Sequence, residues 1–431
     1  MDVRMLRGVR GLRGFPWLPG LRGPWGLAGL RGLSWLPRQP RLRGLRAGVA
    51  LVGALVLVAC AGGGDAGAPA GGAASRAGES AGVRVPSAPG LPGTAYDIGF
   101  AADGSGFTLL AECSRRRCRQ HVGVLDGGAK AWRRGRSPLP DVTGDRGLSA
   151  GLAVLGPGRA LIREGAERAE VPDRTWFTRD GGRTWRRGSA RAVGTTAGVA
   201  PGGTLVQECL ERDRSDPNDC VRERLLAVSP RTGRHHVLAH QPPLKGPLGQ
   251  AGDIPGSGLF VSGADPRTGV PALARSADGG RTWQRARLSG PGKDGPVFRV
   301  VAGRRGLYAT QRGEVSPPAK NGLVTIHVST DEGLTWTRIW RYREGRERTE
   351  PRTLVGDLLV ADDSSLTVHG EDGSWRSTDG ARTFGRVTAR EPSGAATHTP
   401  AGWLWRDSFG KGRFRISADG VRWAEFRVGA A

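Results

Sequence analysis

The sequence predicts an all-β protein built from about seven similar repeats. Its 431 residues include 71 Gly and 29 Pro, which leave little room for long helices. Its apolar runs are short and alternate with polar residues, as in strands that are buried on one side. One eight-residue pattern also recurs at steps of roughly fifty residues. Together these features favour one large β core.

The recurring pattern is Ser/Thr-x-Asp-x-Gly-x-Thr-Trp, and its clearest copy runs from Ser329 to Trp336. The Asp carboxylate can accept hydrogen bonds from the backbone N–H groups just beyond it, and Gly adopts a positive φ at little cost. The Trp starts the next strand and covers its neighbours. The pattern therefore predicts a tight β-hairpin. Its full copies are Asp180 with Trp185, Asp278 with Trp283, and Asp331 with Trp336.

Four less regular copies extend the series. They are Asp379 with Phe384, Asp419 with Trp423 in a copy one residue short, Asp126 in a copy with one extra residue, and Arg231 in a hairpin without the Asp. The steps between positions 126, 180, 231, 278, 331, 379 and 419 are 54, 51, 47, 53, 48 and 40 residues. Seven copies at this spacing predict seven four-stranded blades.

These residues resemble the Asp-box, or bacterial neuraminidase, repeat, which in that family joins the third and fourth strands of a β-propeller blade. The resemblance covers roughly residues 95–430 and implies a seven-bladed β-propeller in residues 94–431. Such propellers are similar to the photosystem II assembly factors and to the ligand-binding ectodomain of sortilin, which hold another protein or peptide. In them, the loops between the second and third strands lie opposite the Asp-box turns. The binding candidates in these loops are Arg115, Arg116, Arg117 and Arg267.

The expected blades follow from the copies. They cover Tyr96–Arg136, about 147–188, about 195–241, about 248–289, Val297–Tyr342, about 353–388 and about 395–428. The last blade is complete without an N-terminal strand, so the way in which the ring closes stays open. Residues 83–85 are a candidate extra edge strand.

Residues 1–59 are predicted to be a basic leader followed by a lipoprotein signal peptide. Ten Arg precede an uninterrupted small and apolar run from Ala47 to Ala59. The run is too short for a membrane-spanning helix, which needs about twenty residues, but is typical of a signal-peptide core. Its end, Leu57-Val58-Ala59-Cys60, resembles a bacterial lipobox. We therefore expect Cys60 to be lipidated and to become the mature N-terminus.

Residues 60–93 are rich in Gly, Ala, Ser and Pro and are predicted to be a disordered tether. The tether would hold the propeller at the extracytoplasmic face of the cell membrane. Removal of residues 1–59 takes away ten Arg and Asp2, so the formal net charge of +24 falls to 54 − 39 = +15, and a positive ring with an arginine-rich loop favours an anionic partner. A nucleic-acid-binding arm is the alternative for the basic leader, but export disfavours nucleic acid as a partner.

The remaining four cysteines form two close pairs, each bracketing a polar loop between two strand-like runs. They are Cys113 with Cys118 and Cys209 with Cys220. Two hairpin disulfides in an oxidising compartment explain this placement. Zinc is the alternative, but neither pair has Cys-x-x-Cys spacing and no nearby His completes a set. We expect no metal and no cofactor.

Resemblance to the sialidases raises the possibility of an enzyme. That family has an Arg-Ile-Pro element, further carboxylate-gripping arginines, an Asp acid/base, and a Tyr nucleophile paired with Glu. Here the segment from Arg84 to Pro86 is the only near match, and the tyrosines are Tyr96, Tyr308 and Tyr342. Tyr342 shares a short segment with Glu344, which an exposed charged loop explains equally well. No catalytic residue can be carried over.

The sequence thus favours a monomeric, membrane-anchored lipoprotein whose propeller is a binding or assembly platform. Its partner would be an envelope protein, a peptide or an anionic glycan. The alternative is a glycoside hydrolase of the exo-α-sialidase type. The two differ in whether carboxylates, or Tyr with Glu, converge among arginines at the centre of the ring.

Overall fold

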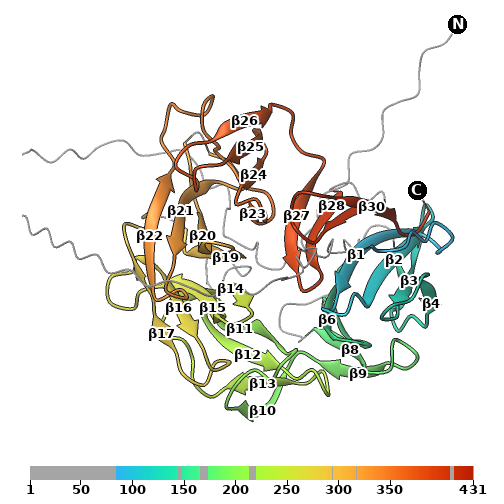
Figure 1. The fold of residues 1–431 in the computed structure, drawn as a ribbon. Helices are drawn as coiled ribbons and strands as arrows, with labels where there is room; N and C mark the ends of the chain where they lie inside the picture. Colours follow the sequence, from blue (N-terminus) through green and yellow to red (C-terminus); the bar gives the residue numbers. More distant parts are fainter. Residues whose placement is uncertain are drawn as a thin grey trace, which may run out of the picture. The chain divides into compact units, whose positions relative to one another are not determined.

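The computed structural model describes residues 84–430, apart from 144–147, 166–172, 213–219, 294, 317 and 408–411. The described residues belong to one compact unit, and their regular elements are all β-strands. The strands form seven sheets, which are the blades of a β-propeller (Figure 1). The predicted seven-bladed fold is therefore confirmed. Within this part of the chain, no helix has the length and hydrophobicity needed to cross a bilayer.

The strands follow the chain from blade to blade. Blade 1 contains β1 (Thr94–Phe100), β2 (Gly106–Cys113), β3 (Arg117–Leu125), β4 (Arg133–Gly135) and β5 (Val142–Thr143), and blade 2 contains β6 (Ala150–Gly156), β7 (Arg159–Glu164), β8 (Arg174–Thr178) and β9 (Arg186–Ser189). Blade 3 contains β10 (Ala192–Thr196), β11 (Thr204–Arg212), β12 (Cys220–Val228) and β13 (His235–Leu238), and blade 4 contains β14 (Lys245–Ile254), β15 (Gly258–Ala264), β16 (Pro271–Ser276) and β17 (Gln284–Arg285).

The last three blades complete the ring. Blade 5 contains β18 (Arg287–Leu288), β19 (Val297–Gly303), β20 (Gly306–Arg312), β21 (Leu323–Ser329) and β22 (Thr335–Arg341). Blade 6 contains β23 (Leu359–Val360), β24 (Leu366–Gly370), β25 (Gly373–Ser377) and β26 (Gly385–Thr388), and blade 7 contains β27 (Gly394–Thr399), β28 (Gly402–Asp407), β29 (Arg413–Ser417) and β30 (Ala424–Arg427).

Blades 3 and 5 depart from a plain four-stranded meander. In blade 3 the sheet order is β10-β13-β12-β11, so β10 adds to the outer edge in parallel with β13. In blade 5 the short strand β18 adds in the same way beside β22. Residues 287–288 therefore pair with blade 5, although the sequence placed them in blade 4. Blade 3 has no strand inside β11 among the described residues (Figure 1).

A hydrogen-bond network around one Asp holds the turn between the third and fourth strands. In blade 5, Asp331 Oδ1 accepts hydrogen bonds from Ser329 Oγ at 2.8 Å and from Thr335 N at 2.9 Å. Asp331 Oδ2 accepts from Thr335 Oγ1 at 2.6 Å, and this bond is the main reason why the pKa of Asp331 falls to about 2. Ser329 Oγ accepts in turn from Gly333 N at 2.8 Å. Both carboxylate oxygens and the Ser329 hydroxyl are thus bonded within the turn.

Four other blades contain this turn. The same bonds surround Asp180, Asp278 and Asp379. In the shorter turn of blade 7, Asp419 Oδ1 accepts from Ser417 Oγ at 3.0 Å, and Asp419 Oδ2 pairs with Arg422 instead of a Thr hydroxyl. The Asp419 carboxylate therefore still holds the turn, although the turn is one residue shorter.

The two weakest copies occupy the expected turns but do not form the network. Asp126 in blade 1 pairs with Arg133 Nε at 2.8 Å, and Arg133 also donates to Gly181 O of blade 2 at 2.6 Å. In blade 3, Gly233 N donates to Ser229 O at 2.8 Å, and Arg234 N donates to Thr232 Oγ1 at 3.4 Å, so the hairpin closes without a carboxylate.

The turn fixes the position of the aromatic residue that follows it and packs onto the preceding blade. In the hairpin register, Trp336 lies opposite Ser329, because the neighbouring pair is Val328 with Thr337. Its ring lies edge-on to Phe260 of blade 4, with 6.1 Å between centroids. Trp185 packs in the same way on blade 1 and Phe384 on blade 5. A local turn thereby sets the contact between blades.

The ring closes through the segment that precedes β1. Ala88 pairs in parallel with Val428, and its N donates to Arg427 O at 2.7 Å. Arg406 Nη1 of blade 7 reaches Asp97 Oδ1 of blade 1 at 2.5 Å. Residues 84–93, which the sequence assigned to the tether, therefore contribute to the propeller. Residues 1–83, with Cys60 and the leader, lie outside the described residues.

Replacing Asp331 by Ala is expected to lower the free energy of unfolding by about 1–3 kcal/mol, because three donors lose their acceptor. Urea unfolding of the full-length protein measures this change. Asp126→Ala is the matched control, because it removes an exposed ion pair at the equivalent turn and should cost less than about 1 kcal/mol. Equal losses in the two variants would contradict a stabilising role for the network.

Candidate functional site

Two disulfides mark the face of the ring opposite the Asp turns. Consecutive antiparallel strands alternate direction, so connections between second and third strands lie at the opposite strand ends from the Asp turns. Cys113–Cys118 joins the ends of β2 and β3, and Cys209–Cys220 joins the ends of β11 and β12. Both predicted pairings are confirmed. Two such bonds indicate an oxidising, extracytoplasmic environment.

The first disulfide carries an arginine tip. Arg115 and Arg116 are exposed, and neither has an ionic partner among the described residues. Arg117 instead pairs with Asp141, which fixes the base of the tip. The predicted candidates in this loop thus divide into two solvent-facing cations and one that is neutralised.

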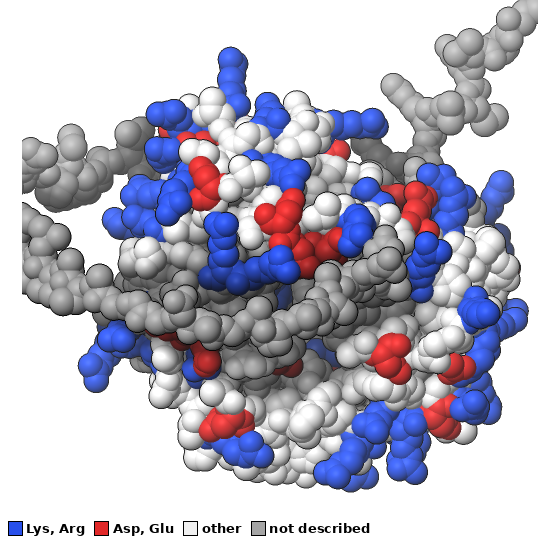
Figure 2. All heavy atoms as spheres, in the orientation of Figure 1, with Lys and Arg blue, Asp and Glu red and all other residues white. Residues whose placement is uncertain are grey.

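Arg267 lies in the β15–β16 turn of blade 4 and is also exposed. Asp265 Oδ1 holds this turn by accepting from Arg267 N at 2.8 Å and from Thr268 N at 2.9 Å. Blades 1 and 4 are not neighbours, so the structure does not bring Arg267 together with the arginine tip. Lys and Arg side chains are spread around the rim, with Asp and Glu between them (Figure 2).

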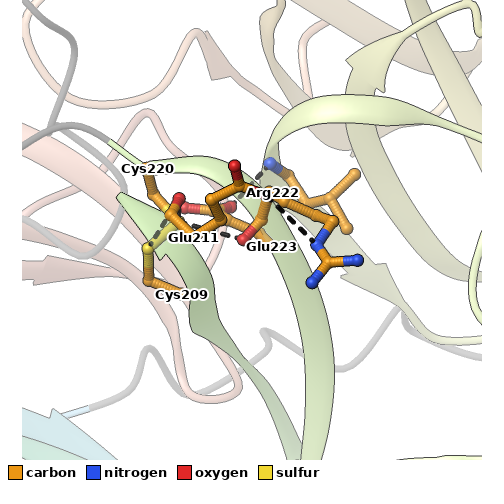
Figure 3. Close-up of a disulfide and its surroundings, with 6 residues drawn as sticks. Cys209, Glu211, Cys220, Arg222 and Glu223 are labelled. Carbon is orange, nitrogen blue, oxygen red and sulfur yellow. Dashed lines mark hydrogen bonds and ion pairs between the residues drawn. A yellow bond between two sulfur atoms is a disulfide. The ribbon is translucent and has the colours of Figure 1, made fainter. Parts of the chain in front are cut away.

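The second disulfide lies beside a carboxyl group that the sequence analysis did not single out. Figure 3 shows Glu211, Arg222 and Glu223 close to Cys209–Cys220. Glu223 Oε2 accepts a hydrogen bond from Leu248 N at 2.7 Å and so joins β12 of blade 3 to β14 of blade 4. Burial raises the pKa of Glu223 to about 7. The sequence contained one signal for this residue. Glu223 is two residues before Leu225, which is buried, and residues two apart in a strand share a face.

A carboxyl group with a pKa near neutrality can act as a general acid, but chemistry also requires a partner. Among the described residues, the Leu248 N–H is the only hydrogen-bond partner found for the Glu223 carboxyl group, and no second carboxyl group bonds to it. No cluster of three or more His, Cys, Asp or Glu in the described ranges could hold a metal ion. Glu223 is therefore a link between blades.

Tyr96 and Tyr308 are two of the three tyrosines that could correspond to the nucleophile of a sialidase. Tyr96 donates to Gln120 Oε1 at 2.8 Å, and burial raises its pKa. Tyr308 is 4% exposed within the blade 5 core, where burial also raises its pKa. Both are packing residues.

Tyr342 does meet a carboxylate, although not the expected one. Its Oη lies 2.9 Å from Glu347 Oε1, whereas Glu344 accepts from Ser316 Oγ at 2.8 Å. Burial, followed by the bond to Glu347, raises the pKa of Tyr342 to about 12. Tyr342 follows β22, which lies near the outer edge of its sheet, so this pair is not at the centre of the ring.

No known family model and no curated protein matches this chain. Among solved structures, it is similar to an uncharacterized protein of Listeria monocytogenes, with 9% identity, a TM-score of 0.41, and coverage of 81% of this chain and 98% of that one. It is also similar to the GH93 α-L-arabinofuranosidase of Fusarium graminearum in complex with arabinobiose, with 10% identity, a TM-score of 0.34, and coverage of 80% and 97%. YCF48 bound to D1 peptide matches with 14% identity, a TM-score of 0.29, and coverage of 80% and 83%. We draw no functional argument from likenesses at this level.

Glu223→Gln is expected to remove a pH-dependent loss of stability. The pKa of Glu223 is higher in the folded than in the unfolded state, so the folded protein binds more protons and its stability falls as pH rises from about 4.5 to 7. The amide keeps an acceptor for Leu248 N without titrating. The Tm of the variant relative to the parent should therefore rise between pH 5 and pH 8. Glu211→Gln, an exposed change nearby, should show no such trend. If the Tm of Glu223→Gln and the Tm of the parent change with pH in parallel, the raised pKa of Glu223 is refuted.

Proposed function

We propose that this protein is an extracytoplasmic lipoprotein whose propeller is a binding platform for an anionic ligand of the cell envelope. The observation that carries the proposal is the tip between Cys113 and Cys118. It presents Arg115 and Arg116 to solvent while Arg117 is bound to Asp141. Guanidinium groups without an internal partner suit carboxylate or phosphate groups, which they bind through two parallel hydrogen bonds.

The anchor is proposed from the sequence. The apolar run that ends at Cys60 has the composition of a lipoprotein signal peptide. The disulfides support an oxidising compartment, which is consistent with export. On this proposal, Cys60 carries the lipid, and the ring lies on the extracytoplasmic face of the membrane.

We also propose that the turns around Asp180, Asp278, Asp331, Asp379 and Asp419 are Asp-box repeats with a structural role. Their carboxylates are occupied by the hydrogen bonds of the turn itself. They therefore have little capacity left for a ligand, and the binding residues belong to the loops on the other face, including Arg267.

A sialidase-like hydrolase is the second candidate, favoured by the contact between Tyr342 and Glu347. A Tyr nucleophile is activated by an adjacent base, and Glu347 is such a group. The platform accounts better for the described residues, because the raised pKa of Tyr342 opposes ionisation of the phenol. Release of sugar from a panel of sialosides and glycans by the full-length protein, lost in Tyr342→Phe, would reverse this preference.

Cys60→Ser is expected to abolish lipid attachment, because it removes the sulfur atom to which the lipid would be joined. Labelling of cells with a fatty-acid analogue and fractionation measure this outcome, and the protein should move from the membrane to the soluble fraction. Cys209→Ala with Cys220→Ala is the control, which should keep the label. A Cys60→Ser protein that still carries the label would overturn the anchor.

Arg115→Glu with Arg116→Glu is expected to weaken binding to isolated cell envelopes on the order of tenfold, or about 1.4 kcal/mol. Co-sedimentation of the full-length protein carrying Cys60→Ser measures the bound fraction without the anchor. Binding by the parent should fall as salt is raised, because exposed charges are screened.

Arg186→Glu with Arg187→Glu is the matched control for this experiment. It makes the same charge change on the exposed outer strand β9 of blade 2. Equal loss in the two double variants would show that net charge alone governs binding. An unchanged affinity in the tip variant would exclude the tip as the contact.

A further inference from the structure

A groove of about 750 Å³ separates the outer parts of blades 6 and 7. Its floor contains Leu359, Thr367 and His369 of blade 6 and Trp405 of blade 7. The walls are the outer parts of the two blades, and the chain that links them, residues 388–393, lies along one end. The groove is separate from the arginine tip, which belongs to blade 1.

The groove lies where blade 6 has a small polar residue, whereas blades 4 and 5 have an aromatic residue and blades 2 and 7 have Leu at the same position. Blade 3 also has a Thr there, but its hydroxyl donates to Gln250 Oε1 of blade 4 at 3.4 Å. Phe260 pairs with Arg275 and Tyr308 pairs with Val328, each directly before the Ser of its Asp turn. The residue at the same position in blade 6 is Thr367, which pairs with Arg376. The space that a ring fills in blades 4 and 5 is therefore left open.

Trp423 faces this space without the contacts that its counterparts make. The register places it opposite Ser417, as Trp336 lies opposite Ser329. The indole Nε1 of Trp336 donates to Gly333 O at 2.9 Å, whereas no hydrogen bond of the Trp423 indole is found within the described residues. Trp423 has the Arg415 guanidinium 6.0 Å from its ring instead of an aromatic partner on blade 6.

The charge of the groove is positive. Arg376, Arg390 and Arg415 line it, and Glu391 is the single carboxylate of the lining. Arg376 pairs with Asp363 at 2.7 Å, which leaves Arg390 and Arg415 as the cations facing the opening. Burial lowers the pKa of His369 to about 4, so its imidazole is neutral at pH 7 and adds no charge.

The mouth of the groove is apolar. Val387 is 64% exposed and Val421 is 48% exposed, one on each side. Such residues at the rim favour contact with aliphatic side chains. The Arg415 guanidinium lies 4.6 Å from the Trp405 ring centroid, so this ring face is already covered and is not free to stack on a sugar.

The backbone beside the groove can also pair with an added strand. Segments of this chain lie parallel to the outermost strands of blades 3, 5 and 7, namely β10, β18 and Ala88. In the part of the chain that the structure describes, β26 of blade 6 has no such neighbour. An extended peptide can occupy this edge and direct alternate side chains into the groove.

We propose that the groove between blades 6 and 7 binds an extended acidic peptide of a partner protein. Aliphatic side chains would contact Val387, Val421 and Trp423, while carboxylates would pair with Arg390 and Arg415. Strands β24 and β25 are five residues long, which corresponds to about 17 Å and to a peptide of similar length. The chain's own leader is basic and does not fit this charge.

The test measures fluorescence anisotropy of a labelled hexapeptide, Asp-Leu-Glu-Leu-Asp-Leu, with the full-length protein. The parent should bind it, and a peptide with Lys in place of Asp and Glu should not bind. Thr367→Phe restores the ring that blades 4 and 5 carry, so it should fill the groove and weaken binding at least roughly tenfold. Unchanged affinity in a folded Thr367→Phe protein would overturn the proposal.

A second variant keeps the test decisive if Thr367→Phe fails to fold. Val387→Asp changes an exposed residue and places a negative charge at the mouth, so it should weaken binding of the acidic peptide at least roughly tenfold as well. Val193→Asp on β10, which is 59% exposed, is its matched control and should have no effect. Loss of affinity in both valine variants, or equal binding of both peptides, would overturn the proposal.

The arginine tip between Cys113 and Cys118 provides an independent control for the peptide-binding experiment. Arg115→Glu with Arg116→Glu should leave the affinity for the peptide unchanged, because the tip is on blade 1. Peptide binding that depends on the tip and not on Val387 would assign the peptide to the envelope-binding loops and would refute the groove as its site.

Discussion

The propeller depends on the carboxylate of one Asp in each of five turns. That carboxylate accepts from a hydroxyl before it and from the backbone and side chain of the residues after it. The turn then has one geometry, and the hairpin has one register. Because side chains alternate along a strand, a slip by one residue would turn the following aromatic residue away from the preceding blade. A local hydrogen-bond network thus specifies contacts between neighbouring sheets.

Blades 1 and 3 show what replaces this network. Arg133 links Asp126 to Gly181 O, so blade 1 is tied to the turn of blade 2 by an ion pair and a hydrogen bond. Blade 3 has no carboxylate at its turn, which backbone bonds and the Thr232 hydroxyl close, and it carries the disulfide Cys209–Cys220 at its other end. Each irregular blade therefore has a covalent cross-link in the hairpin that joins its second and third strands, since blade 1 has Cys113–Cys118.

The turns and blades could be predicted from the sequence because each turn motif is contiguous and repeats. The closure of the ring could not be predicted, because Ala88 and Val428 are far apart in the chain. The bridge between them involves backbone atoms that any sequence supplies. The parallel strands β10 and β18 were missed for the same reason. The pairing of Tyr342 with Glu347 instead of Glu344 depends on the path of one loop, which no periodicity encodes.

Departures from the repeat are more informative about binding than the repeat itself. A residue that satisfies the pattern is occupied by packing or by the turn, whereas Thr367 leaves a space because it is too small for its position. The space is bounded by Trp423, which still obeys the register, and by arginines that no consensus position requires. Identical blades would bury their aromatic residues in identical contacts. Between blades 6 and 7, a small residue at this position accompanies an accessible groove in place of the aromatic contact that joins blades 4 and 5.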